Sequence, residues 1–424
     1  MAAQRWLLTS WGSAGDIHPF LALAEGLQRC GHSITLALDP MWENKARLTH
    51  AAFCPLIQHS QQALLSSLHD AFSTRHIGLS ALKTLLSKGI APIFKEAYQT
   101  LCKLIPQHDG MIAHHFSFSA HAAADRHKSP IFTITLAPGI TPGHGQGPAG
   151  TSWIFPRNPW LFPISKIAWI VGRQLMRRVT DPIINHLRQE VGLPPINNAF
   201  YAGFTRQALL QLYSPSFAPP APEWPPEWHP LGFAFWKEPW PPIQDDQALT
   251  MFLDNNDPPW LITLGTTIIE HPGLFFETVM SALRTRRAIF LAGRHAMLLK
   301  NKNLHSEAHF ITDYIPLYRI LPHCRAVIHH GGIGTTAEVL RAGKPSIVIP
   351  HAFDQPQNAA RLAHLGAALT LPATSLTADS LLAAITQIEN NPHFTTAALN
   401  LAKQINQEEP ITAIHSRILS SNKC

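Results

Sequence analysis

The chain has 424 residues. A chain of this length is too long to fold around a single hydrophobic core, which predicts two domains. The net charge of +6 is concentrated in residues 1–210, which carry 18 Lys+Arg and 10 Asp+Glu. That excess suits an anionic ligand or surface, or only a solubilising face, and the absence of a Lys/Arg block interleaved with aromatic residues argues against nucleic-acid binding. Five cysteines without a CxxC pair argue against a disulfide framework or zinc site and favour a cytoplasmic location.

The first elements form a βαβ unit. Trp6–Ser10 is predicted to be a buried strand, followed by a turn at residues 12–15. Pro19 is expected to begin a helix that Gly31 ends. Apolar and other residues alternate over Ser33–Leu38, which predicts the next strand. A βαβ unit implies a parallel sheet, to which residues 110–113 and 131–136 add further strands. The start of the chain does not resemble a signal peptide.

The apolar stretch Trp153–Val171 is interrupted by prolines and charges, so we do not expect it to span a bilayer. Aromatic residues are frequent throughout 140–180, which fits an apolar binding pocket or ordinary core packing. Three arginines follow the stretch and would suit membrane headgroups, so a peripheral contact with the inner face of the membrane is a further hypothesis. The residues concerned are Trp153, Phe155, Trp160, Phe162, Trp169, Arg173, Arg177 and Arg178.

A Pro/Trp-rich segment divides the chain. Residues 216–242 cannot sustain a helix or a central strand, and their tryptophans suggest that the segment packs onto a domain. Strand and helix patterns alternate after it, which predicts a doubly wound α/β fold. We therefore predict two Rossmann-like domains facing each other across a cleft: an acceptor-binding domain at 1–215, the linker at 216–242 and a nucleotide-sugar-binding domain at 243–424.

The strongest motif is the glycine-rich run at residues 329–338, placed between a predicted strand and a predicted helix. Its glycines allow the backbone to approach a ligand, and the N–H groups of a helix N-terminus suit a diphosphate. His330 can add a hydrogen bond, and Glu338 can bind a ribose diol. A purely structural glycine turn is the alternative. Asp354 and Gln355 follow the next predicted strand, where they suit sugar hydroxyls or else cap a helix.

With these motifs the sequence resembles the nucleotide-sugar glycosyltransferases of the GT-B fold, family 1 type. The resemblance is strongest to the bacterial branch that includes rhamnolipid rhamnosyltransferase, sterol glucosyltransferases and glycopeptide-antibiotic glycosyltransferases. It is most specific over 314–362, holds at family level over 12–32, and is loose over 40–255. The resemblance implies donor-binding roles for Thr263, Gly265, Thr266, Tyr314, Ile315, His330, Gly332, Gly334, Thr335, Glu338, Asp354 and Gln355.

The catalytic base is expected in the N-terminal loop. Plant members of the family place a histidine three residues before the loop proline, and this chain has Asp16 there, as its bacterial relatives do. Asp16 would accept the proton of the attacking hydroxyl; alternatively, it only caps the helix. His18 is a second candidate. His114 and His115 follow a predicted strand and are candidates for lining the acceptor pocket or for pairing with Asp16.

The resemblance implies an inverting transfer of a hexose from a UDP- or dTDP-sugar to a hydroxyl of a lipid, sterol or other apolar small molecule. We expect no metal and no cofactor beyond this co-substrate, because the helix N-terminus and His330 supply the charge stabilisation. No Asp-x-Asp pair follows a predicted strand. A non-catalytic sugar-nucleotide-binding or auxiliary protein is the alternative of another class. An epimerase or a peptidoglycan-type transferase on a similar fold is a second enzymatic alternative, and the Asp354–Gln355 pair favours a glycosyltransferase over an epimerase.

Overall fold

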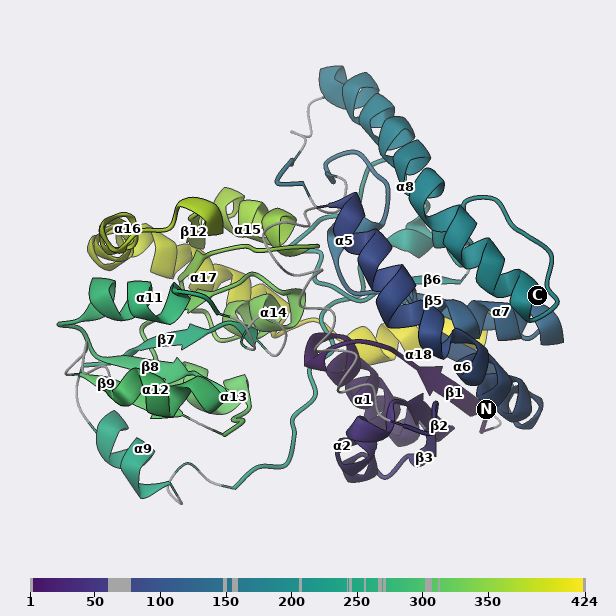
Figure 1. Ribbon diagram of the computed structural model, residues 1–424, viewed down its shortest axis with the longest axis horizontal. Coiled ribbons are helices and arrows are strands. Elements are labelled where there is room, and N and C mark those ends of the chain that lie inside the picture. The colour runs from purple at the N-terminus through teal and green to yellow at the C-terminus, as the bar shows by residue number, and fades with distance from the viewer. Residues whose placement is uncertain are drawn as a thin grey trace. The chain divides into compact units, whose positions relative to one another are not determined.

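The computed structural model describes most of the chain, in two compact units of parallel α/β structure (Figure 1). Unit 1 comprises residues 1–236 and 408–424, and unit 2 comprises 237–407. The described residues are 3–59, 78–147, 151–154, 159–205, 208–241, 243, 246–254, 257–265, 269, 272–301, 307–311 and 313–421.

Unit 1 is built on a six-stranded parallel sheet in the order β3-β2-β1-β4-β5-β6. The strands are β1 (Arg5–Thr9), β2 (Ser33–Leu38), β3 (Ala52–Pro55), β4 (Gly110–His114), β5 (Ile131–Thr135) and β6 (Leu209–Gln211). The helices are α1 (Ala14–Arg29), α2 (Glu43–Leu48), α5 (Leu79–Thr84), α6 (Ala91–Leu104), α7 (Phe118–His127), α8 (Phe162–Glu190) and α18 (Pro410–Ser421). The central strands are fully buried apolar runs, as expected for a parallel sheet covered on both faces.

Unit 2 repeats this architecture with the strand order β12-β11-β10-β7-β8-β9. Its strands are β7 (Trp260–Thr263), β8 (Ala288–Leu291), β9 (Ala308–Ile311), β10 (Ala326–His329), β11 (Ser346–Val348) and β12 (Ala368–Thr370). Its helices are α9 (Gln247–Leu253), α11 (Phe275–Leu283), α12 (Ala296–Asn301), α13 (Leu317–Ile320), α14 (Ile333–Arg341), α15 (Gln355–His364), α16 (Ala378–Asn390) and α17 (Pro392–Ile405). The prediction of two Rossmann-like units is confirmed.

The predicted start of the first helix was wrong by more than one turn. The helix α1 begins at Ala14 and contains Pro19. Its start is set by a capping box, in which Ser13 is the N-cap and the Asp16 carboxylate accepts a hydrogen bond from the Ser13 backbone N–H at 2.8 Å. This local exchange of hydrogen bonds outweighs the preference of proline for a first helical position.

The long helix α8 was not expected, because prolines interrupt the stretch from which it begins. Pro163 lies in its first turn, where a missing N–H costs nothing, and Pro182 is accommodated within the helix. No helix in the described parts of the chain is both long and apolar enough to cross a membrane.

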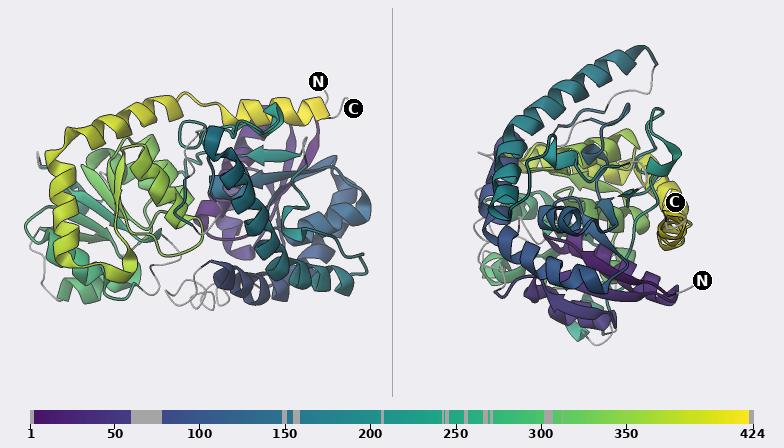
Figure 2. Two further views of the ribbon diagram at one scale, coloured as in Figure 1. Left: turned by 90° about the horizontal axis from the view of Figure 1, so that it is seen from above. Right: turned by 90° about the vertical axis from the view of Figure 1, so that its right-hand side faces the viewer.

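The boundary between the units, at 236/237, lies inside the segment predicted as a linker. Its tryptophans pack as expected: Trp224 donates to the Pro142 carbonyl at 2.7 Å and Trp236 to the Glu25 carboxylate at 2.9 Å. The sequence analysis placed the C-terminal residues in the second domain, but residues 408–424 belong to unit 1. The helix α18 packs on α1, where a Cβ added to Gly26 would lie 2.5 Å from Ile411 (Figure 2). The roles of the two units in binding acceptor and donor stay predictions.

Candidate functional site

The glycine-rich run joins β10 to α14, as predicted, with Gly332 as the N-cap of the helix. Gly331 has a φ of +87°, and a Cβ there would lie 2.8 Å from Val348. Only glycine suits this left-handed and crowded position. Gly334 and Thr335 occupy the first turn of α14, where N–H groups have no preceding helical carbonyl to bond. The turn therefore presents donors at the positive end of a helix.

His330 is enclosed by two glycines from different elements. A Cβ added to Gly332 would lie 2.4 Å from its Nε2, and one added to Gly265 would lie 2.5 Å from its Cε1. Burial, followed by the neighbouring His329 and His351, holds the pKa of His330 well below its ordinary value. Its ring is therefore neutral, and its Nδ1 has no hydrogen-bond partner among the described residues.

Asp354 and the start of α14 are joined by hydrogen bonds. The Asp354 carboxylate accepts from the backbone N–H of Ile333 and, at 2.6 Å, from the Asn358 side-chain amide. Asn358 also donates to the Gly331 carbonyl at 2.9 Å. Burial raises the pKa of Asp354 to about 6, although these hydrogen bonds oppose the shift. The motifs around residues 331 and 354, separate in sequence, thus form one cluster, and Asn358 is a member that the sequence analysis had not singled out.

Gln355 is buried at the start of α15, beside Asp354. Its side-chain oxygen accepts hydrogen bonds from the backbone N–H groups of His351 and Ala352, at 2.8 and 3.1 Å. The side-chain oxygen of Gln355 therefore stabilises the preceding turn. The predicted binding of sugar by Gln355 would then use its NH₂ group.

Glu338 lies one turn into α14 and is paired with Arg341 at 2.6 Å. Burial raises the pKa of Glu338, while Arg341 and Lys237 act in the opposite direction. Arg341 was not singled out from the sequence, although a cation three residues after an acid on a helix is a recognisable signal. The pair keeps a charged carboxylate in a half-buried position beside the glycine-rich turn.

Tyr314 forms part of an aromatic corner. The Trp240 ring meets it edge-on, with centroids 5.6 Å apart and planes at 74°. The Tyr314 hydroxyl donates to the Glu238 carboxylate, and the Tyr318 hydroxyl donates to the Glu238 backbone carbonyl at 2.6 Å. Burial and then Glu238 raise the pKa of Tyr314 above its ordinary value. Tyr314 was predicted from the sequence, but Trp240 was missed because it lies in the segment assigned to the linker.

The remaining predicted donor residues lie near this corner or at the end of β7. Ile315 packs against the hydrophobic cluster that contains Ile320 and Val327. Thr263 ends β7, and its hydroxyl accepts a hydrogen bond from the Gly265 N–H at 3.3 Å. Gly265 has a φ of +67°. The predicted residue Thr266 lies outside the described residues.

Asp16, the predicted base, belongs to unit 1. Its carboxylate accepts from the Ser13 hydroxyl at 3.0 Å as well as from the Ser13 backbone. A Cβ added to Gly12, whose φ is +129°, would lie 2.4 Å from this carboxylate. Asp16 thus does have the capping role that was its alternative interpretation, as the third helical residue. The two hydrogen bonds from Ser13 also hold the Asp16 carboxylate beside the backbone of Gly12, at the amino end of α1.

His18 is buried between Trp42 and Trp236, with ring-centroid distances of 6.1 and 5.2 Å. Burial, with a smaller effect from Lys45, lowers the pKa of His18 to about 3. Its Nε2 has no hydrogen-bond partner within the described part of the chain. His18 is therefore a neutral, packed side chain.

His114 and His115 lie where β4 ends, among other buried polar groups. Burial lowers the pKa of His114 to about 3, and burial followed by His114 lowers the pKa of His115 well below its ordinary value. Several side-chain atoms at this edge of the sheet lack a hydrogen-bond partner among the described residues: Thr9 Oγ1, His114 Nδ1, both ring nitrogens of His115, Ser117 Oγ and Thr135 Oγ1.

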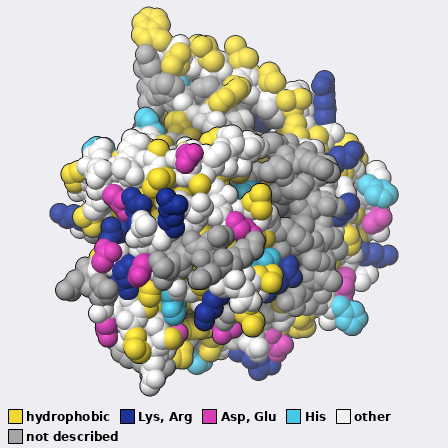
Figure 3. All heavy atoms as spheres, turned by 60° about the vertical axis from the view of Figure 1, so that its left-hand side comes forward, with side chains coloured by type: hydrophobic (Ala, Val, Ile, Leu, Met, Phe, Trp, Pro, Cys, Tyr) yellow, Lys and Arg dark blue, Asp and Glu magenta, His cyan; other side chains and the backbone are white. Residues whose placement is uncertain are grey.

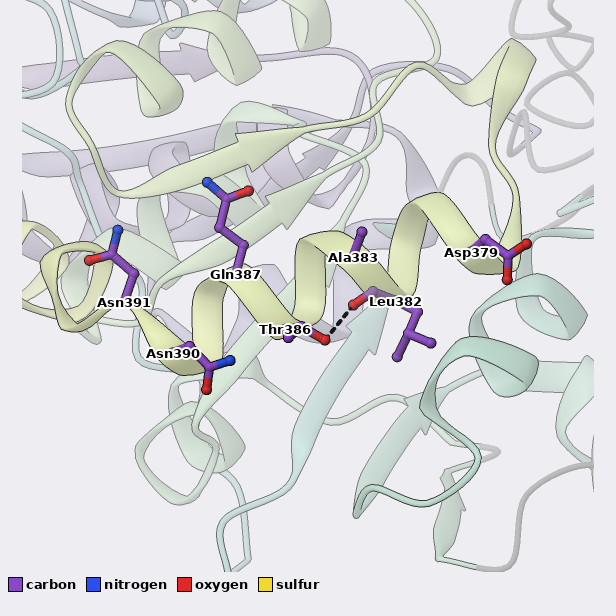
Figure 4. A pocket seen from close by; sticks show the side chains of 7 residues that line it. All are labelled: Asp379, Leu382, Ala383, Thr386, Gln387, Asn390 and Asn391. Carbon is purple, nitrogen blue, oxygen red and sulfur yellow. Dashed lines mark hydrogen bonds between the residues drawn. The ribbon is translucent and has the colours of Figure 1, made fainter.

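Residues 140–180 do not form one pocket lining. Trp169 is buried and donates to the carbonyls of Gly143 and Gln146, at 3.0 and 2.9 Å. Trp153 and Trp160 are exposed, and Phe155 lies outside the described residues. A separate surface hollow, lined by α16 from Asp379 to Asn391, contains no predicted site residue (Figure 4). The described residues contain no group of three or more His, Cys, Asp or Glu side chains arranged to hold a metal ion.

Comparisons with known proteins point to the same class. Residues 6–133 match the glycosyltransferase family 28 N-terminal domain, and residues 302–418 match the erythromycin biosynthesis protein CIII-like C-terminal domain. The chain is 28% identical to O-mycaminosyltylonolide 6-deoxyallosyltransferase of Streptomyces fradiae, over 96% of this chain and 95% of that protein. It is 23% identical to sterol 3-beta-glucosyltransferase UGT80B1 of Arabidopsis thaliana, over 95% of this chain and 65% of that protein.

The fold is also shared with solved structures. The crystal structure of the glycosyltransferase VinC in complex with dTDP superposes with a TM-score of 0.69 at 17% identity, covering 99% of this chain and all of that one. The two family models flank the linker and together match more than half of the chain. The chain is therefore a GT-B glycosyltransferase of the family 28 and family 1 type, an enzyme that uses nucleotide-sugar donors.

Proposed function

We propose that this enzyme transfers a hexose, with inversion and without a metal ion, from a UDP- or dTDP-sugar to a hydroxyl group of an apolar small molecule such as a lipid or sterol. The observation that carries the proposal is the cluster at the start of α14. There the neutral His330, enclosed by Gly265 and Gly332, lies beside the N-cap of the helix, and Asp354 accepts a hydrogen bond from the Ile333 N–H of its first turn.

In this proposal, hydrogen-bond donors and the positive end of the α14 dipole hold the diphosphate. The N–H groups of Gly334 and Thr335 and the His330 ring would donate to its oxygens, and the helix dipole favours the negative charge that develops on the leaving group. Glu338 would accept hydrogen bonds from the ribose diol, while Tyr314 and the backbone of Ile315 would contact the base. Asp354 and the Gln355 NH₂ group would bind the sugar hydroxyls.

The acceptor hydroxyl loses its proton to the Asp16 carboxylate in this mechanism. Its oxygen forms the new bond to the anomeric carbon as the bond from that carbon to the β-phosphate oxygen breaks. The nucleoside diphosphate leaves with the bonding electron pair. The acceptor class is supported by the relatives, which act on a macrolide and on sterols by name, and by the buried, unpartnered polar atoms beside His114, which offer hydrogen bonds to a hydroxylated ligand.

Two measurements test the proposal. Thermal melting with UDP, dTDP, GDP and ADP should show stabilisation by UDP or dTDP that His330→Ala removes, with about 2.7 kcal/mol expected at a hundredfold excess over the dissociation constant. Product analysis with UDP-glucose and dTDP-rhamnose against a panel of sterols and hydroxylated lipids should then show transfer that Asp16→Asn reduces by about a hundredfold or more and that EDTA leaves unchanged.

The second measurement also tests the role of Asp16. Transfer that Asp16→Asn leaves unchanged would contradict the catalytic role of Asp16 and leave this residue with only its structural task in the capping box.

A further inference from the structure

The first half of α8 exposes an apolar face. Ile164, Ile167, Ile170, Val171 and Leu175 are 42–61% exposed and recur at the three- and four-residue spacing of one helix face. This spacing places them on one side of the helix, over about 17 Å of its length. Trp160, just before the helix, is 86% exposed. Single exposed apolar residues are ordinary on protein surfaces, but a continuous row of them marks an interaction site.

The opposite face of the same segment fixes this orientation. Trp169 is buried and donates to two backbone carbonyls, those of Gly143 and Gln146. Ser165 is also buried, and its hydroxyl lies 2.7 Å from Nδ1 of His144. These hydrogen bonds prevent α8 from turning its apolar row inward. Hydrophobic side chains gather along the upper margin of the space-filling view, the end toward which α8 projects in Figure 1 (Figure 3).

The charge around this row has one sign. No Asp or Glu occurs from residue 126 to residue 180. Lys166 and Arg173, seven residues apart, are exposed beside Ile170 at one edge of this face, and Arg178 is exposed one turn beyond Leu175. Arg177 is engaged with Asp181 at 3.3 Å. This segment of the chain therefore combines apolar side chains with cations and contributes no carboxylate that would repel phosphate.

The charge also decides which occupant fits. A symmetric dimer through this face would bring the same cations of two copies together, which disfavours a second copy of this chain. An anionic bilayer accepts both features, because the apolar row inserts at the boundary of headgroups and acyl chains while the cations meet lipid phosphates. We propose that the segment from Trp160 to Arg178, which includes the first half of α8, docks this enzyme onto the surface of an anionic membrane. This inference does not depend on the donor or acceptor of the reaction.

The full chain is tested by flotation with vesicles of phosphatidylcholine alone and of phosphatidylcholine mixed with phosphatidylglycerol. Wild type should float with the anionic vesicles and release as salt is raised. The triple variant Ile164→Ser, Ile167→Ser, Val171→Ser should bind at least tenfold more weakly. Lys166→Gln with Arg173→Gln should weaken binding by about fivefold per charge and abolish most of the difference between the two vesicle types.

The matched control replaces exposed apolar residues of unit 2, with Leu274→Ser and Met297→Ser, which are 76% and 73% exposed in wild type. This control should float like wild type. The proposal is overturned if wild type does not float with the anionic vesicles. It is equally overturned if the triple variant floats with them as well as the control does. It is also overturned if size-exclusion chromatography with light scattering shows a dimer that the triple variant abolishes, because a second copy would then be the occupant.

Discussion

The His330 ring lies so close to Gly332 that a methyl group on Gly332 would stand 2.4 Å from Nε2. Gly332 itself has a φ of −59°, which any residue adopts, so the need for glycine is steric and not conformational. The glycine therefore keeps the histidine in its place at the end of β10.

Gly332→Ala should displace the ring and weaken UDP or dTDP binding by about tenfold to a hundredfold, the cost of losing a hydrogen bond to a charged group. Isothermal titration calorimetry measures the affinity. The melting temperature without nucleotide is the control that shows whether the variant is folded. Unchanged affinity in a folded variant would contradict the role of His330 in binding the diphosphate.

Asp354 should make the reaction dependent on pH near 6, the raised pKa that burial gives its carboxyl group. The ionised form above that pH accepts hydrogen bonds from sugar hydroxyls, so kcat/KM should fall as the pH falls through 6. Asp354→Asn should lower kcat/KM by about tenfold to a hundredfold at pH 8 and flatten this limb of the profile. Asp379→Asn on α16 is the control and should keep the wild-type dependence of kcat/KM on pH. If Asp354→Asn also keeps that dependence, the titrating group is not Asp354.

Trp240 should contribute to binding of the nucleobase, since its ring forms a corner with Tyr314. Trp240→Ala should weaken binding of UDP or dTDP by about three- to tenfold, whereas Trp240→Phe should retain most of the affinity. Inorganic pyrophosphate serves as the control ligand, because it has no base and should bind both variants like wild type. An equal loss for pyrophosphate and nucleotide would show that Trp240 acts on the fold of the site.

Buried histidines should make the protein less stable in acid. Burial lowers the pKa values of His114 and His329 to about 3, and those of His115 and His330 lie well below the ordinary value of 6.5. Below pH 6.5 the unfolded chain binds protons at these sites and the folded chain does not, so stability is present above that pH and lost below it. The raised pKa of Asp354 acts in the opposite direction between its ordinary value and about 6.

From pH 7 to 5.5 the unfolding free energy should therefore fall by several kcal/mol, about 1 kcal/mol for each histidine whose pKa burial lowers to about 3 or 4, less the opposing carboxyl effect. Urea denaturation at fixed pH values measures it. His114→Gln should reduce this dependence, whereas replacement of the exposed His364 should leave it unchanged. A stability that rises as the pH falls over this range would contradict the interpretation.

Local patterns were enough to predict much of the fold. Ser33–Leu38 has the predicted bounds, because a short, mostly apolar run between turn signals specifies a buried strand. The helix α8 was missed because two prolines mask a pattern that only shows as helical when Trp169 is known to be buried. The start of α1 was misplaced because the proline was given more weight than the Ser13–Asp16 capping box.

The amino-acid sequence was sufficient for the class of fold and for the nucleotide-binding motif, since glycines between a strand and a helix act over a few residues. Tertiary structure decided which of these residues meet. The bond between Asn358 and Gly331, the enclosure of His330 by Gly265 and the contact of Trp240 with Tyr314 join residues that lie 27 to 74 positions apart. Such contacts depend on the order of strands in the sheet and on how loops pack over its edge, and no local periodicity encodes either.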